Sequence, residues 1–142
     1  MHKFSENFLP GYGAQSTALG GETSDTITSA AFINMQNYHN IVVYGIASGV
    51  ASDAVLTLTL WEATASAGTG SQTTTHTDTF TSTNTTDTDV LQAEIKADEL
   101  SSGFTHIGAK LVSNDGSCTG IVGLLHVAGS PRYARNSLPA NS

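Results

Sequence analysis

The chain has 142 residues, enough for one domain with a single modest core. Five Lys plus Arg stand against twelve Asp plus Glu, a net charge of −7, so the chain lacks the basic character that nucleic-acid binding requires. Charged residues make up 12% of the chain, and much of the rest is Thr, Ser and Gly, which suit strands and turns better than helices. We therefore expect one all-β domain.

The amino-terminal residues 1–25 favour an extended arm over a core element. They carry Pro10, Gly11, Gly13 and the pair Gly20-Gly21 with no sustained periodicity. The stretch MHKFSENFLPGYG has no apolar run of the length of a secretion signal, and residues 41–50 are far shorter than the roughly 20 residues of a membrane helix. We expect a protein with no membrane partner.

Strands are predicted next at residues 26–33, 40–48 and 53–62. In the last of these, DAVLTLTLWE, Leu56, Leu58 and Leu60 alternate with Val55, Thr57, Thr59 and Trp61. Residues 63–72 are a small-residue loop, and the Thr-rich tract after it predicts an edge strand at 75–81.

Alternation returns at residues 90–96 and 104–113, with a turn at 97–102 between them. The sequence Asn114-Asp115-Gly116 is a strong hairpin signal, so residues 118–128, apolar on both faces, are predicted to pair with 104–113. The single cysteine, Cys118, is expected to be a small buried hydrophobe on this strand. Residues 130–142 lose periodicity and form a carboxy-terminal tail. We expect one antiparallel, jelly-roll-like β-sandwich over residues 26–129, of about seven or eight strands, between two extended arms.

Residue patterns for catalysis or metal binding are missing from the sequence. The five histidines show no HxH or HExxH spacing, no GxSxG turn is present, and the acidic pairs Asp87/Asp89 and Asp98/Glu99 lie beside turns. His106 and His126 could face each other across the predicted hairpin; an ordinary cross-strand pair is favoured over a metal contact there. We expect no enzyme, no metal and no cofactor. Trp61 is expected to pack at an interface or core rim rather than to serve as a ligand platform.

Three segments carry a resemblance to a known family. FINMQNYHNIVVYGIASG is similar to the family's opening strand pair, LTLWEATASAGTGSQ to a strand with its small-residue loop, and ADELSSGFTHIGAKLVSNDGSCTGIVGLLHVAGSPRYA to its closing strands and Arg-Tyr. Together they make the chain resemble the capsid decoration (cement) or minor head structural proteins of tailed bacteriophages. The sequence departs from the family in Pro131 before Arg132-Tyr133 and in the Thr-rich tract at 73–88.

The resemblance implies a virion component that is assembled in the host cytoplasm. It would bind the major capsid protein on the capsid surface as a homo-oligomer, often a trimer. The apolar strand at 121–127 or the Trp61 face would lie at subunit contacts. The candidate capsid or subunit contacts are Phe4, Phe8, Leu9, Tyr12, Trp61, Arg132, Tyr133 and Arg135. The alternative is a head-fibre or receptor/glycan-binding domain that uses the loop at 63–72 and the Thr-rich tract. An enzyme acting on polysaccharide is the least favoured reading.

Overall fold

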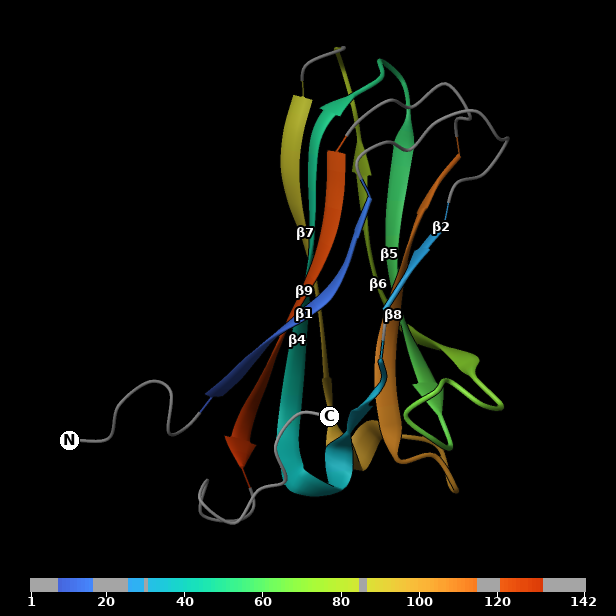
Figure 1. Cartoon of the computed structure of the whole chain (residues 1–142). Coiled ribbons are helices and arrows are strands. Elements are labelled where there is room, and N and C mark those ends of the chain that lie inside the picture. Colours follow the sequence, from blue (N-terminus) through green and yellow to red (C-terminus); the bar gives the residue numbers. More distant parts are fainter. Residues whose placement is uncertain (1–7, 17–25, 30, 85–86, 115–120, 132–142) are drawn as a thin grey trace, which may run out of the picture.

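The computed structural model of the chain describes residues 8–16, 26–29, 31–84, 87–114 and 121–131 (Figure 1). These residues form strands and two short 3-10 turns. The strands are β1 (Phe8–Ser16), β2 (Thr26–Thr28), β3 (Ile33–Asn34), β4 (Tyr38–Val50), β5 (Val55–Ala63), β6 (Gln72–Thr81), β7 (Asp87–Lys96), β8 (His106–Ser113) and β9 (Ile121–Pro131), and the turns are η1 (Met35–Asn37) and η2 (Ala97–Glu99).

The strands form two antiparallel sheets that pack face to face. Sheet A has the order β1-β9-β4-β7, and sheet B has the order β2-β8-β5-β6 with β3 also paired to β8. Within these sheets β1 pairs with β9, β2 and β3 with β8, β4 with β7, and β5 with β6. These nested pairs are what a long hairpin produces when it is rolled into two sheets, which is a jelly roll. The predicted all-β sandwich is confirmed.

The core lies between the sheets and comes from the inward half of each alternating strand. Leu56, Leu58 and Leu60 of β5 are all fully buried, as their spacing predicts. Ile107 and Leu111 of β8 belong to the same cluster. The alternation read from the sequence therefore identifies the inward face of each sheet.

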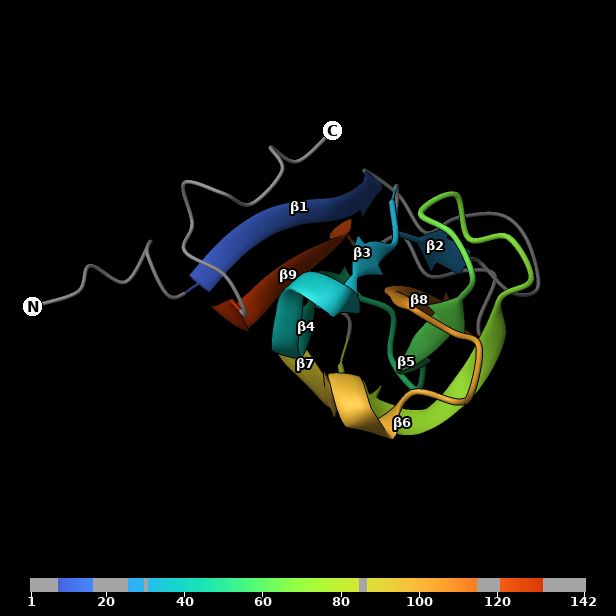
Figure 2. The ribbon, with the colours of Figure 1, turned by 90° about the horizontal axis from the view of Figure 1, so that it is seen from below.

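Two edges of the sandwich meet on one side, where β6 of sheet B lies along β7 of sheet A (Figure 2). The loop at residues 64–71 joins β5 to β6, and these two strands pair as a hairpin. This places the Thr-rich tract at a sheet edge, as the sequence predicts.

The structure corrects several expectations. The single strand predicted at residues 26–33 is replaced by two short strands, β2 and β3. Residues 8–16, assigned to an extended arm, are strand β1 at the edge of sheet A. The predicted hairpin between β8 and β9 is wrong, because β8 belongs to sheet B and β9 to sheet A. Asn114 instead continues sheet B: its backbone N–H donates to the Val55 carbonyl at 3.0 Å, and its side-chain oxygen accepts from the Val55 N–H at 2.7 Å. Residues 115–120, with Cys118, lie outside the described part.

Candidate interaction surface

The outward face of sheet A carries a continuous group of apolar side chains. Because residues alternate between the two sides of a strand, the side chains next to the buried ones point away from the core. We call the resulting surface the sheet A face, and we define it by the outward residues Val42, Tyr44, Ile46, Val90, Leu125 and Val127.

The strand register brings these six residues together. Val42 is opposite Val127, and Tyr44 is opposite Leu125, in the pairing of β4 with β9. Ile46 is opposite Val90 in the pairing of β4 with β7. These cross-strand pairs form three neighbouring rows across β9, β4 and β7. The six side chains therefore form one continuous patch.

Three of these residues are the large hydrophobic side chains that remain exposed in the described part of the chain. Ile46 is 43% exposed, Val90 53% and Leu125 36%. A contiguous apolar patch on an otherwise polar surface commonly marks a contact with another macromolecule. This patch is therefore the candidate functional site.

The same face is almost free of charge. The outward residues of β4 from Asn40 to Ser48 and of β9 from Gly123 to Gly129 include no charged side chain. Charges appear at one end of β7, where Glu94 accepts a hydrogen bond at 3.2 Å from the side chain of Asn40. Glu94 lies opposite Val42, and Lys96, which also points outward, lies opposite Asn40. The rows of Tyr44 and Ile46 can therefore be buried without removing an ion from water.

The outward face of sheet B has a different character. Lys110 places its ammonium 3.4 Å from the centre of the Trp61 ring, a cation–π contact within the chain. Around it the outward residues of β6 are exposed threonines, among them Thr77, whose hydroxyl donates to the Leu58 carbonyl at 2.8 Å. Trp61 is half-buried, and one side of its ring already has a partner.

Next to Trp61, Phe32 is buried against sheet B. The β5–β8 register sets Trp61 opposite Gly108, and a Cβ at Gly108 would lie 2.8 Å from two carbons of the Phe32 ring. The Phe32 N–H donates to the Ser66 carbonyl at 2.9 Å, which holds the loop at 64–71 in place. This part of sheet B is therefore covered by its own chain.

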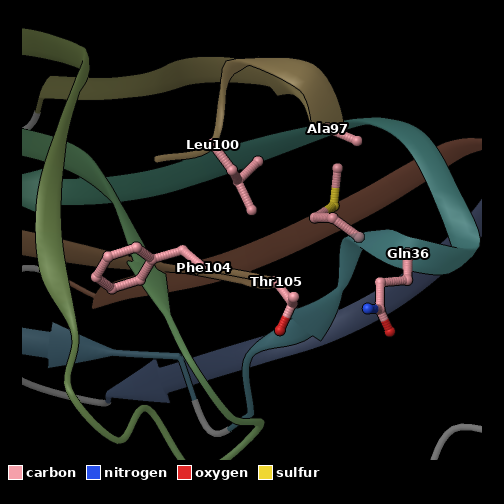
Figure 3. Close-up of a pocket in the computed structure, with 6 residues that line it drawn as sticks. Gln36, Ala97, Leu100, Phe104 and Thr105 are labelled. Atoms are coloured by element: carbon pink, nitrogen blue, oxygen red, sulfur yellow. The ribbon is translucent and has the colours of Figure 1, made fainter. Parts of the chain in front are cut away.

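A small pocket of about 200 Å³ opens at the end of the sandwich where η1 and η2 lie (Figure 3). Its lining combines apolar and polar groups from both turns and from the segment before β8. The lining residues are Met35, Gln36, Ala97, Leu100, Phe104 and Thr105. It holds no ionisable side chain, so acid–base chemistry has no group to use there.

A second hollow, of about 180 Å³, lies beside the buried carboxylate of Glu62. Gln72 donates to one oxygen of Glu62 at 2.6 Å, and the Ser101 N–H donates to the other at 2.8 Å. Burial alone would raise the pKa of Glu62, but the hydrogen bonds from Ser101 and Gln72 outweigh burial and lower the pKa. This carboxylate therefore ties β5 to β6 and to the segment after η2.

The four histidines in the described part of the chain do not assemble into a site. His106 and His126 lie on different sheets, so the cross-strand pair expected between them is wrong. No group of three or more His, Cys, Asp or Glu side chains within the described ranges is arranged to hold a metal ion. His126 is 7% exposed, its Nε2 has no hydrogen-bond partner, and burial lowers its pKa.

The predicted contact residues fall in three places. Trp61 lies on sheet B, away from the sheet A face. Phe8, Leu9 and Tyr12 lie on β1, and Tyr12 pairs in register with Leu125. Phe4, Arg132, Tyr133 and Arg135 lie outside the described residues.

Sequence reasoning found part of the sheet A face and missed the rest. The apolar strand at 121–127 was expected at a subunit contact, and it supplies Leu125. Ile46 and Val90 were missed, although the run IVVYGI on β4 is apolar at both odd and even positions. That double-sided pattern was the available signal.

Comparison with models of protein families and with curated proteins found no match for this chain. Within the described residues, no helix has the length and apolar character needed to cross a membrane.

Proposed function

We propose that this protein is a non-enzymatic virion component that decorates the capsid of a tailed bacteriophage. In this proposal several copies associate, bind the outer surface of the capsid and stabilise the lattice of the major capsid protein. The observation that carries the proposal is the exposed, largely apolar sheet A face on a two-sheet jelly roll. Such a face is suited to contact with other protein subunits.

The resemblance to phage decoration proteins supports the proposal because it follows the elements of the fold. The first resembling segment spans β3, η1 and β4, and the second spans most of β5 and the loop after it. The third runs from η2 through β8 and β9. The resembling segments therefore include β5 and β8 of sheet B, which supply core residues, and β4 and β9, which carry most of the sheet A face.

The chemistry of the described residues also favours a structural role. Glu62, the buried carboxylate, has both oxygens engaged by Gln72 and Ser101. Asp87 accepts hydrogen bonds from the backbone N–H groups of Thr83 at 2.6 Å and Asn84 at 3.2 Å, so it stabilises a turn. Carboxylates used in this way hold the chain together and are not free to act on a substrate.

A decoration protein needs modest affinity at each site, because many copies on one lattice multiply weak contacts into stable coverage. Arg132 and Arg135 are basic residues near the end of an acidic chain. In our proposal they approach an acidic patch on the capsid protein, while the jelly roll supplies the rigid body. Assembly in the host cytoplasm and a final location on the virion follow from this role.

Co-sedimentation tests the proposal. The purified full chain is mixed with mature phage heads from which its gene has been deleted, and the bound copies per major capsid subunit are counted on a quantitative gel. We expect saturation at one copy per capsid subunit or a simple fraction of it. No binding, or a few copies per particle, would overturn the decoration role.

Two variants sharpen this test. Exchange of Arg132 and Arg135 for Glu is expected to reduce occupancy, and unchanged occupancy would remove the tail from the proposal. Deletion of residues 1–7 removes Phe4 but leaves β1 intact, which a longer deletion would not. This deletion therefore tests the amino-terminal contact without loss of an edge strand.

A glycan-binding head-fibre domain remains the alternative. Its proposed contact surface would be Trp61 with the loop at 64–71 and the exposed threonines of β6. Lys110 occupies one side of the Trp61 ring, which leaves less of it for stacking on a sugar. Glycan-array binding that disappears in Trp61→Ala would favour this alternative over capsid decoration.

A further inference from the structure

We propose that the sheet A face binds a second copy of this chain. The inference rests on the proposed function in one respect, because both require several copies to assemble side by side. It goes further by naming the surface that joins the copies. It assigns the copy-to-copy contact to the outward residues of β4, β7 and β9. The capsid contact is then made by other parts of the molecule.

Charge favours a second copy as the occupant. Each chain carries a net charge of −7, so two copies repel each other wherever their acidic surfaces meet. The outward side chains of β4 and β9 include no charged group, and the outward charges of β7, Glu94 and Lys96, are of opposite sign, so two copies can approach here with little repulsion between like charges. A strongly charged partner would gain little from this face, because its two outward charges cancel.

The arrangement of the apolar rows is compatible with self-association. A two-fold contact uses the same patch on both partners, so the patch must be complementary to itself. The aliphatic side chains and Tyr44 within these three rows meet this requirement, since apolar surfaces attract without directional pairing. Val90 and Ile46, the two most exposed residues, pair across β7 and β4 within one row.

The size of the face is adequate for a modest contact. Three strands about 4.8 Å apart and three rows about 6.7 Å apart outline roughly 300 Å² of flat sheet. Standard interfaces bury about 800 Å² of accessible surface on each partner, so this face supplies the apolar centre of a small contact. We therefore expect association that depends on protein concentration.

The outward surface of sheet B is less suited to binding a second copy than the sheet A face. Its aromatic residue, Trp61, is held by Lys110, and the surrounding strand β6 presents exposed threonines. Burial of this surface would remove water from the Lys110 ammonium and from a row of threonine hydroxyl groups. The large exposed hydrophobic residues within the described part of the chain all lie on sheet A.

Analytical ultracentrifugation of the full chain over a range of concentrations tests the inference. The test variants are Val90→Glu and Ile46→Glu, which place a charge on the face at positions that are already exposed. The matched control is Thr79→Glu, which adds the same charge at an exposed strand position on sheet B. Val90→Ser, which adds no charge, serves as a milder variant, and thermal melts followed by circular dichroism show that each protein folds.

We expect the native chain and Thr79→Glu to associate with equal strength. Val90→Glu and Ile46→Glu should melt cooperatively and associate at least about 100-fold more weakly, because each contact then buries an unpaired charge. Val90→Ser should lie between them. Sedimentation of the native chain as a single copy at every concentration, or native-like association of folded Val90→Glu, would overturn the inference.

A chain lacking residues 132–142 tests whether the carboxy-terminal tail, instead of a second copy, occupies the sheet A face. Self-association that appears only in this shortened chain would mean that the tail covers the face, and it would overturn the inference. Head binding by the same proteins separates the two proposals. A native chain that associates through sheet A but binds no heads contradicts the decoration role alone, whereas one that binds heads as single copies contradicts the self-contact alone.

Discussion

The carboxylate of Asp78 on β6 accepts a hydrogen bond at 2.9 Å from the backbone N–H of Gln92 on β7. The two strands belong to different sheets, and each is the outer strand of its sheet on this side of the sandwich. A second oxygen of Asp78 accepts from the Thr79 N–H, also at 2.9 Å. One side chain therefore satisfies edge N–H groups of both sheets, which would otherwise be open to pairing with another chain.

Removal of this link should weaken the closed side of the sandwich. Asp78→Ala leaves the N–H groups of Gln92 and Thr79 without their carboxylate, and we expect a loss of about 1–3 kcal/mol in the free energy of unfolding. Urea denaturation measures the loss, and amide exchange at Gln92 should accelerate. Asp98→Ala, on exposed η2, removes the same charge as a control. Equal stability of the two variants would contradict the edge role of Asp78.

The sequence predicted best those strands whose position follows from the local alternation of apolar and polar residues. Leu56, Leu58 and Leu60 alternate with polar residues, and alternation is a property of a strand with one buried face. The β1 strand was missed because Pro10 and its neighbouring glycines indicate irregular chain. Pro10 pairs with Val127 on an edge strand, where a residue without an N–H is tolerated because one side of the strand has no neighbouring strand among the described residues.

The connection after β8 was misjudged because a hairpin signal is local. Asn114-Asp115-Gly116 favours a tight turn, but β8 already has β5 on one side and β2 and β3 on the other. No edge of β8 is left for β9, which pairs instead with β1 and β4. The sheet A face was partly missed for the same reason: Ile46 and Val90 become neighbours only through the β4–β7 register.

Glu62 should make the free energy of unfolding depend on pH in the acidic range. Its lowered pKa means that the folded protein holds the charged form more strongly than the unfolded chain does, so this stabilisation is present above the unfolded pKa of about 4.3 and is lost as pH falls through the folded pKa. Glu62→Gln should cost about 1–3 kcal/mol at neutral pH, because the charge-assisted bonds to Ser101 and Gln72 are lost.

Urea denaturation of the native protein and Glu62→Gln between neutral pH and about pH 3 measures this effect. The difference between the two should shrink as pH falls, since protonated Glu62 resembles the amide. Asp98→Asn is the control, because Asp98 is an exposed acidic residue on η2. A constant difference across the whole range would show that Glu62 acts through packing and not through its charge.

His126 should destabilise the fold at mildly acidic pH. Burial lowers its pKa, so the unfolded chain takes up a proton more readily than the folded protein. Stability is therefore full above the unfolded pKa of about 6.5 and falls as pH drops from there toward the folded pKa. In His126→Leu the melting temperature should depend less on pH over this window. His39→Gln, which changes an exposed histidine, should keep the pH dependence of the native protein. An unchanged slope in His126→Leu would assign the pH dependence to other groups.

Gly108 should resist substitution because of Phe32. A Cβ at this position would lie 2.8 Å from the Cε2 and Cζ atoms of the Phe32 ring, which is closer than atoms can pack. Gly108→Ala must displace the ring and the loop that Phe32 anchors through Ser66, at a cost of about 1–3 kcal/mol. A double-mutant cycle with Phe32→Ala measures the coupling by urea denaturation. In the Phe32→Ala background the same glycine substitution should cost much less, because the clash is gone, and an equal cost in both backgrounds would place the strain in the β8 backbone instead.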